Sequence, residues 1–159
     1  MTDAPQAPST ASPPLHNGRV LARFVLRLAA MGYDLMLIAS VVMLAGFLYL
    51  PVTGGEAPEP GSWAALLFQL YLLGVVYLFF VGFWMHGGRT LGMLAWRLRL
   101  VDGDGRPPGL GRASLRFALC LLSWATLGAG FLWALFDPQN RAFHDRYSGT
   151  WLIREPQDG

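Results

Sequence analysis

The chain has 159 residues, of which 53% are hydrophobic and only 14% are charged, and its formal net charge at pH 7 is +2. A soluble domain of this size carries about 25% charged residues. The composition and the long uncharged apolar runs therefore exclude an ordinary soluble domain and predict a single integral membrane domain. The small net charge gives no reason to expect a nucleic-acid partner.

Residues 1–18 are rich in proline, serine, alanine and threonine. They lack the positively charged region followed by an apolar region that defines a cleavable signal peptide. We therefore predict a disordered tail over residues 1–18. The membrane domain is expected over residues 19–155, and a short C-terminal tail over residues 156–159.

The first apolar segment covers residues 21–50 and contains three charged side chains, Arg23 and Arg27 near its start and Asp34 further along. A helix of about 20 residues crosses a hydrocarbon core of about 30 Å, so this segment is long enough to span, and Pro51 is expected to end it. A carboxylate at the bilayer centre costs at least a few kcal/mol. Asp34 is therefore expected either to belong to a structural ion pair or to perform a task.

The second apolar segment covers residues 63–85 and has no charged residue. Ser62 is a suitable N-cap for this helix, and Gly87 and Gly88 are expected to end it. Tryptophans near both ends, Trp63 and Trp84, are typical of the two interfaces of a membrane. The segment predicts a second transmembrane helix.

Arginine placement predicts the orientation of these two helices. Arginines precede or begin the first helix and recur between residues 89 and 116, after the second. The loop between the helices, residues 51–62, contains Glu56 and Glu59 and no basic residue. The positive-inside rule therefore predicts that the N-terminus and residues 89–116 lie in the cytoplasm.

A third apolar run, residues 115–136, is also long enough to span, but arginines flank it on both sides. Gly128 and Gly130 near its centre allow a break in the helix. Two alternatives follow: a third span with an external C-terminus, or a re-entrant segment with both ends in the cytoplasm. We favour the cytoplasmic C-terminus, because residues 97–101 and 150–154 both resemble strands and lone strands need each other as partners. Residues 90–96 predict a short amphipathic helix in the cytoplasmic interface.

Several motifs occur together in a fixed order along the chain. Arg27 and Asp34 lie seven residues apart in the first helix; the sequence Gly-Arg-Thr-Leu-Gly-Met-Leu-Ala-Trp occupies residues 88–96; and Phe-Asp-Pro-Gln-Asn-Arg-Ala-Phe-His-Asp-Arg-Tyr-Ser-Gly-Thr occupies residues 136–150. This set, over roughly residues 19–155, resembles the RDD family of small, mainly bacterial multi-pass membrane proteins. That family is named for one arginine and two aspartates, which match Arg27, Asp34 and Asp145. Met93 stands where many relatives carry a basic residue.

The resemblance implies a bacterial inner-membrane location and a transport role, since some members are associated with sodium/proton exchange. Helix geometry places Arg27 and Asp34 on one face of the first helix, about 10 Å apart along its axis. Arg23 lies near the same face. If the segment around Asp145 folds back against the cytoplasmic end of the first helix, Asp145 can bond to Arg27 and complete an Arg–Asp–Asp network. His144, beside Asp145, is a weaker supporting candidate, because adjacent residues in a helix point apart.

Two functions are favoured at this stage over a third, a membrane enzyme that acts on lipid or peptide. One is transport of an ion or small solute, with a cation or proton at Asp34 and a homo-oligomer or partner membrane protein completing the pathway. The other is a non-catalytic membrane scaffold or adaptor in which the network is structural. The sequence has no Ser-His-Asp order, no paired-histidine zinc spacing and no phosphate loop. We therefore expect no enzyme, no metal site and no cofactor. For the fold, we expect an all-α membrane protein with two transmembrane helices, a third membrane-embedded segment, a short cytoplasmic helix and a two-stranded β element.

Overall fold

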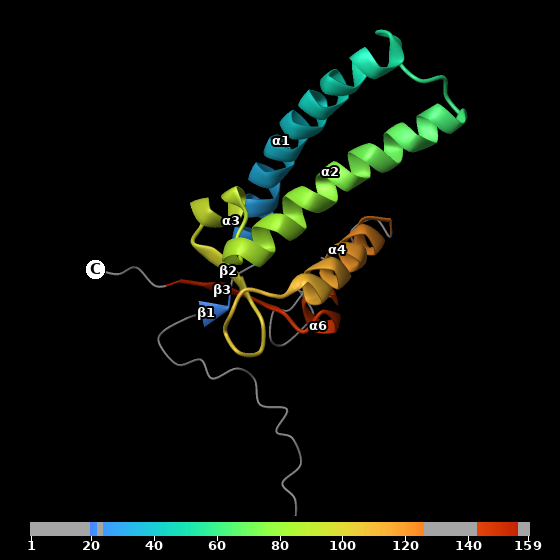
Figure 1. The fold of residues 1–159 in the computed structure, drawn as a ribbon. Helices are drawn as coiled ribbons and strands as arrows, with labels where there is room; N and C mark the ends of the chain where they lie inside the picture. The colour runs from blue at the N-terminus through green and yellow to red at the C-terminus, as the bar shows by residue number, and fades with distance from the viewer. Residues whose placement is uncertain (1–19, 22–23, 126–142, 156–159) are drawn as a thin grey trace, which may run out of the picture.

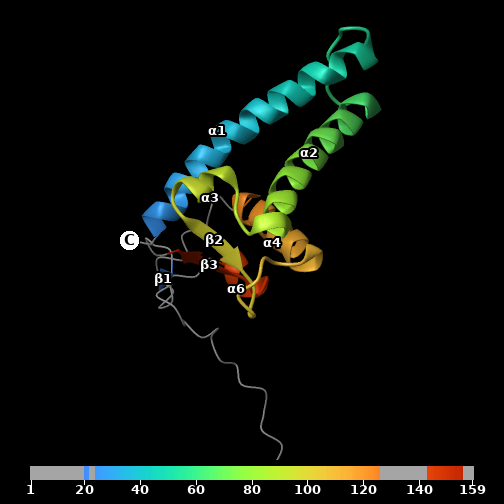
Figure 2. The ribbon, with the colours of Figure 1, turned by 60° about the vertical axis from the view of Figure 1, so that its left-hand side comes forward.

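The computed structural model describes residues 20–21, 24–125 and 143–155. Two long helices, α1 (Phe24–Tyr49) and α2 (Trp63–Gly87), lie side by side and extend away from the rest of the chain. A small sheet and the short helices α3 (Leu91–Ala95) and α6 (Phe143–Tyr147) gather at the other end of this pair, and α4 (Leu110–Ala125) packs against α2 (Figures 1 and 2). The molecule is thus mostly helical, as the composition predicted.

Both long helices could cross a membrane. Residues 25–53 and 63–87 form continuous apolar helical stretches of 29 and 25 residues, and 25 residues of α-helix span about 38 Å against a hydrocarbon core of about 30 Å. Large apolar side chains on them are widely exposed, including Met36 at 74%, Met43 at 76% and Leu78 at 70%. Such surfaces are typical of helices that face lipid.

The ends of these helices follow local rules. α1 ends in a turn of 3₁₀ helix, η1 (Leu50–Thr53), which contains Pro51. The Ser62 side chain accepts a hydrogen bond from the amide of Ala65, 3.1 Å away, so the predicted N-cap of α2 is confirmed. α2 ends at Gly87 because Gly88 adopts a left-handed conformation with φ +70°, which glycine tolerates without strain.

The predicted strand pair is present and gains a third member. β2 (Leu98–Val101) pairs antiparallel with β3 (Trp151–Arg154), with Leu98 opposite Arg154 and Val101 opposite Trp151. A two-residue strand, β1 (Val20–Leu21), pairs with the other edge of β3, so the order is β1-β3-β2. The first helix therefore starts at Phe24 rather than at residue 21. Val20 and Leu21 satisfy backbone groups on this edge of β3.

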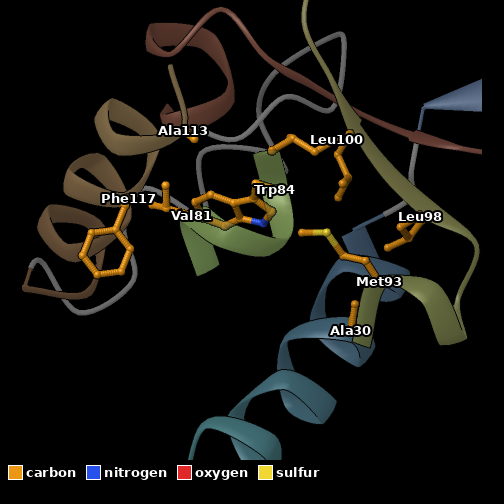
Figure 3. Packing of buried hydrophobic residues seen from close by; sticks show 9 residues of the cluster. Ala30, Val81, Trp84, Met93, Leu98, Leu100, Ala113 and Phe117 are labelled. Carbon is orange, nitrogen blue, oxygen red and sulfur yellow. The ribbon is translucent and has the colours of Figure 1, made fainter. Parts of the chain in front are cut away.

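The apolar core lies where α1, α2 and α4 meet the sheet (Figure 3). Trp84, at the end of α2, lies between Met93 of α3 and the side of α4 that carries Ala113 and Phe117. The sheet contributes leucines that are almost fully buried. The members of this core are Ala30, Val81, Trp84, Met93, Leu98, Leu100, Ala113, Phe117 and Leu152.

The third apolar run is described only in part. α4 begins at Leu110, five residues before the predicted start of the run, and is described to Ala125, a length of 16 residues. Residues 126–136 lie outside the described residues, so the choice between a third span and a re-entrant segment stays a prediction. α3 is a helix at the predicted place, while its position at a membrane interface also stays a prediction.

Candidate functional site

Asp145 lies fully buried in α6 and is paired with arginines from two other helices. Its Oδ2 accepts a hydrogen bond from Arg27 of α1, and its Oδ1 accepts one from Nη1 of Arg116 of α4, 2.5 Å away. Arg27 and Arg116 are themselves 7% and 3% exposed. One carboxylate thus joins three helices that lie far apart in the sequence. The structure brings together Arg27 and Asp145, the pair that the sequence argument considered.

Hydroxyl groups and an aromatic ring complete the surroundings of Arg116. Its Nη1 also donates to Thr150 Oγ1 at 2.8 Å, and Thr150 and Ser148 share a hydrogen bond of 2.8 Å between their hydroxyls. The guanidinium carbon lies 5.3 Å from the centre of the Trp84 ring, a cation–π arrangement. Sequence reasoning placed Arg116 only among the arginines that set orientation. The feature that could have singled out Arg116 in the sequence is its position at the start of an apolar run.

Charge at this cluster is fixed over the ordinary pH range. Burial alone would raise the pKa of Asp145, but Arg116 and Arg27 outweigh it and hold that pKa well below its usual range. His144 is buried beside it, with Nε2 3.6 Å from Asp145 Oδ1, although the two side chains were expected to point apart. Burial and the nearby Arg116 lower the pKa of His144 to about 3, so this imidazole is neutral at neutral pH.

Asp34 belongs to a second, separate centre on α1. It is 4% exposed, its Oδ2 accepts a hydrogen bond of 2.5 Å from Thr90 Oγ1, and its Oδ1 accepts one of 2.9 Å from the amide of Gly92. Thr90 Oγ1 in turn accepts from the amide of Met93 at 3.2 Å. Among the described residues, the hydrogen-bond partners of Asp34 are therefore neutral groups at the start of α3. The expected single Arg–Asp–Asp network is divided into two centres.

Gly92 allows α3 to dock this closely on α1. A Cβ atom at this position would lie 2.3 Å from the carbonyl oxygen of Ala30 and 2.7 Å from Oδ1 of Asp34. No side chain fits there without movement of the backbone. Sequence reasoning missed this contact, and the glycine within the short helix at residues 90–96 was the only local signal.

A cavity of about 290 Å³ lies between α1, α2 and α4, and both centres contribute to its wall. Arg27, Arg116 and His144 line one part of it, Asp34 lines another, and most of the remaining surface is apolar. Arg23, the other supporting candidate from the sequence, lies outside the described residues. Within residues 20–21, 24–125 and 143–155, no three histidine, cysteine, aspartate or glutamate side chains are grouped as metal ligands.

Comparison with known proteins identifies the family. The chain is 32% identical over 90 residues to an uncharacterized protein of Rickettsia prowazekii (strain Madrid E); this covers 56% of the present chain and 49% of the rickettsial one, so the match spans about half the length of that relative. No solved structure matches the chain. The family model described as "RDD family" matches residues 21–149, which contain Asp34, Asp145 and the two arginines that pair with Asp145. The chain therefore belongs to the RDD family.

Proposed function

We propose that the protein is a multi-pass protein of the bacterial inner membrane, with α1 and α2 as spanning helices and the N-terminus in the cytoplasm. Three observations support this topology. The two helices expose apolar side chains along their length. The loop that joins them carries Glu56 and Glu59 and no basic residue. The arginine-bearing sheet, α3 and α6 lie at the opposite end of the pair (Figure 1).

Within that membrane, the protein transports an ion or small solute, and Asp34 is the group that binds the cation or proton. The observation that carries this proposal is the placement of Asp34 in the wall of the cavity between α1, α2 and α4, with neutral hydrogen-bond partners. A carboxylate without a fixed cationic partner can take up a proton or a cation and leave no other buried charge uncompensated.

Asp145 is unsuited to the same task. Two guanidiniums already occupy both of its oxygens, and protonation would leave two buried arginines without their shared counter-charge. It therefore positions α6 against α1 and α4 and shapes one end of the cavity.

A transport pathway needs more than this chain supplies by itself. Two spanning helices and one further embedded segment are few for a path across the bilayer. The working unit is therefore a homo-oligomer or a complex with another membrane protein.

The second candidate function is a non-catalytic membrane scaffold. The Asp145 cluster favours it, because a fully buried ion network from three helices is sufficient to explain why these charges are retained. In this alternative the Asp34 cap of α3 is structural as well, and the protein acts through partners that bind its surface.

Flux in proteoliposomes separates the two functions. The purified chain is reconstituted at matched incorporation as wild type, Asp34→Asn and Glu59→Gln, and sodium- and pH-driven flux is measured. The transport proposal expects flux in wild type and Glu59→Gln and loss of at least about 10-fold in Asp34→Asn, because asparagine cannot carry the charge. Flux that survives Asp34→Asn would exclude Asp34 as the transport group, and absence of flux in all three would favour the scaffold.

A further inference from the structure

The cavity between α1, α2 and α4 has one polar end and one apolar end. Arg27, Trp84 and Arg116 line it near the cytoplasmic ends of the three helices, as the topology above orients them. Further along the same helices it is lined by apolar side chains, which include Ile38 of α1, Val76 of α2, and Phe117, Leu121 and Trp124 of α4. In each of the three helices, the polar residue lies nearer the cytoplasmic end of the helix than the apolar residues do.

Two hydrogen-bond donors at the polar end have no acceptor among the described residues. They are Nε1 of Trp84 and Nε of Arg116, both buried, in side chains that are 4% and 3% exposed as residues. The Arg116 guanidinium carbon lies over the Trp84 ring, 5.3 Å from the ring centre. Buried N–H groups without an acceptor cost free energy, so a ligand oxygen placed between these groups would be stabilised.

The charge at this end also favours an anion. Of the described side chains there, Arg27 and Arg116 share the single carboxylate of Asp145, and His144 beside them is neutral. Asp34, the other carboxylate in the wall, lies about two helical turns further along α1. Both of its oxygens already accept hydrogen bonds from residues at the start of α3.

The length of the apolar part fits a hydrocarbon chain. From Arg27 to Ile38 is eleven helical residues, or about 16 Å along the axis. The hydrocarbon of one leaflet is about 15 Å deep, half of the roughly 30 Å core. An alkyl chain that runs from the level of Arg27 to the level of Ile38 would therefore have about the length of a lipid tail in one leaflet.

We propose that this cavity binds a single-chain amphiphile whose anionic oxygen headgroup accepts hydrogen bonds from Trp84 and Arg116 and whose alkyl tail lies against Ile38, Val76 and Trp124. A carboxylate and a phosphate both provide this headgroup chemistry. The site goes beyond the proposed transport function, because it rests on Trp84 and Arg116 rather than on Asp34.

Native mass spectrometry of the full chain, released from a nonionic detergent, tests the proposal. The probes are dodecanoate, its methyl ester, and a lysophosphatidate with the same acyl chain. We expect one or both anionic probes to be retained at least about 10-fold more tightly than the methyl ester, since hydrogen bonds to a charged group are the stronger ones. Retention of dodecanoate alone assigns the site to a free fatty acid, and retention of lysophosphatidate alone assigns it to a lipid headgroup. Equal retention of the ester and the anions, or retention of none of them, would overturn the proposal.

Two variants locate the binding. Trp84→Phe keeps an aromatic ring beside Arg116 and removes the Nε1 donor, so affinity for the anionic probe is expected to fall about 10-fold. Trp63→Phe is the matched control, because Trp63 lies at the other end of α2, is 83% exposed and does not line the cavity, and it is expected to change the affinity less than about 3-fold. Unchanged affinity in Trp84→Phe would contradict the assigned headgroup position.

Should Trp84→Phe fail to fold, Val76→Phe gives an independent test. This substitution narrows the apolar end of the cavity and is expected to weaken the binding of dodecanoate more than that of hexanoate. Because Asp34 is intact in all these variants, loss of amphiphile binding and loss of ion flux are separate outcomes.

Discussion

Asp145 and Asp34 are buried to nearly the same degree, at 0% and 4% exposure, but their partners differ in charge. Asp145 bonds to two guanidiniums that come from α1 and α4. Asp34 bonds to a hydroxyl and an amide at the start of α3. The first arrangement fixes tertiary structure, because removing its charge takes a shared carboxylate away from two buried guanidiniums. The second fixes a short helix, and none of the described cationic side chains bonds to its carboxylate, so we expect Asp34 to tolerate a change of charge better.

The largest effect is expected from Asp145→Asn. Removal of the shared counter-charge leaves Arg27 and Arg116 buried together, and the loss of a partner from a buried ion pair costs about 3–5 kcal/mol. We expect the free energy of unfolding in detergent, followed by circular dichroism during thermal or denaturant unfolding, to fall by that amount.

Asp104→Asn is the control for this variant, because Asp104 is exposed, and its stability should stay within about 0.5 kcal/mol of wild type. An Asp145→Asn protein as stable as wild type would show that the two arginines do not depend on this carboxylate.

The next effect concerns the docking of α3 on α1. Gly92→Ala places a Cβ atom 2.3 Å from the carbonyl oxygen of Ala30, so α3 has to move away. Overpacking of this kind costs about 1–3 kcal/mol, and we expect a corresponding drop in unfolding free energy. Gly111→Ala in α4 is the matched control, since a Cβ there meets open space. Equal stability of the two variants would mean that the close approach of α3 is not maintained in the folded protein.

Stability is expected to fall as the pH is lowered from 7 to 5, because of His144. Burial and Arg116 lower its pKa from 6.5 to about 3 in the folded chain, so the unfolded chain binds a proton in this window and the folded chain does not. Stability therefore rises with pH between these values, by at most about 2 kcal/mol between pH 5 and 6.5. Asp145 adds nothing to this slope, since its lowered pKa keeps it charged throughout.

Thermal melts across that pH range check the assignment to His144. The slope should flatten in His144→Gln and persist in His86→Gln, because His86 is an exposed residue. A slope that is unchanged in His144→Gln would assign the dependence to other groups.

The smallest effect is expected at the surface of the sheet. Glu155 bridges Arg89 at 3.1 Å and Arg99 at 3.4 Å, and all three side chains are partly exposed. Pairs of this kind contribute about 0–1 kcal/mol and weaken with salt. Glu155→Gln should therefore lower the unfolding free energy by less than 1 kcal/mol, and the difference should shrink in high salt. A loss as large as that of Asp145→Asn would remove the contrast between buried and surface pairs.

The sequence was sufficient for the features that depend on local composition or on backbone pairing. Uncharged apolar runs of about 20 residues or more predict membrane-spanning helices, and two isolated strand-like segments at residues 97–101 and 150–154 need each other for hydrogen bonding. Ser62 and Gly88 cap the start and the end of α2 by local geometry alone. These elements were predicted to within a few residues, apart from the late start of α1 and the added strand β1.

The partners of the two carboxylates depend on tertiary contacts that the sequence does not display. Arg116 looks like one of many arginines that set orientation, and only the packing of α4 brings it to Asp145. Thr90 and Gly92 reach Asp34 across 56 and 58 residues of chain, because α3 docks on α1. Helix periodicity correctly put Arg27 and Asp34 on one face, but it carries no information about which neighbour each of them meets.

The most direct test of the contrast is to measure flux per incorporated molecule and unfolding free energy together in Asp34→Asn and Asp145→Asn. We expect Asp145→Asn to lose about 3–5 kcal/mol of stability while its folded fraction keeps flux within a few-fold of wild type. Asp34→Asn should lose at most about 1–2 kcal/mol, the cost of a weakened cap, while its flux falls at least 10-fold. The reverse pattern, with flux lost in folded Asp145→Asn and retained in Asp34→Asn, would contradict the assignment of these two carboxylates.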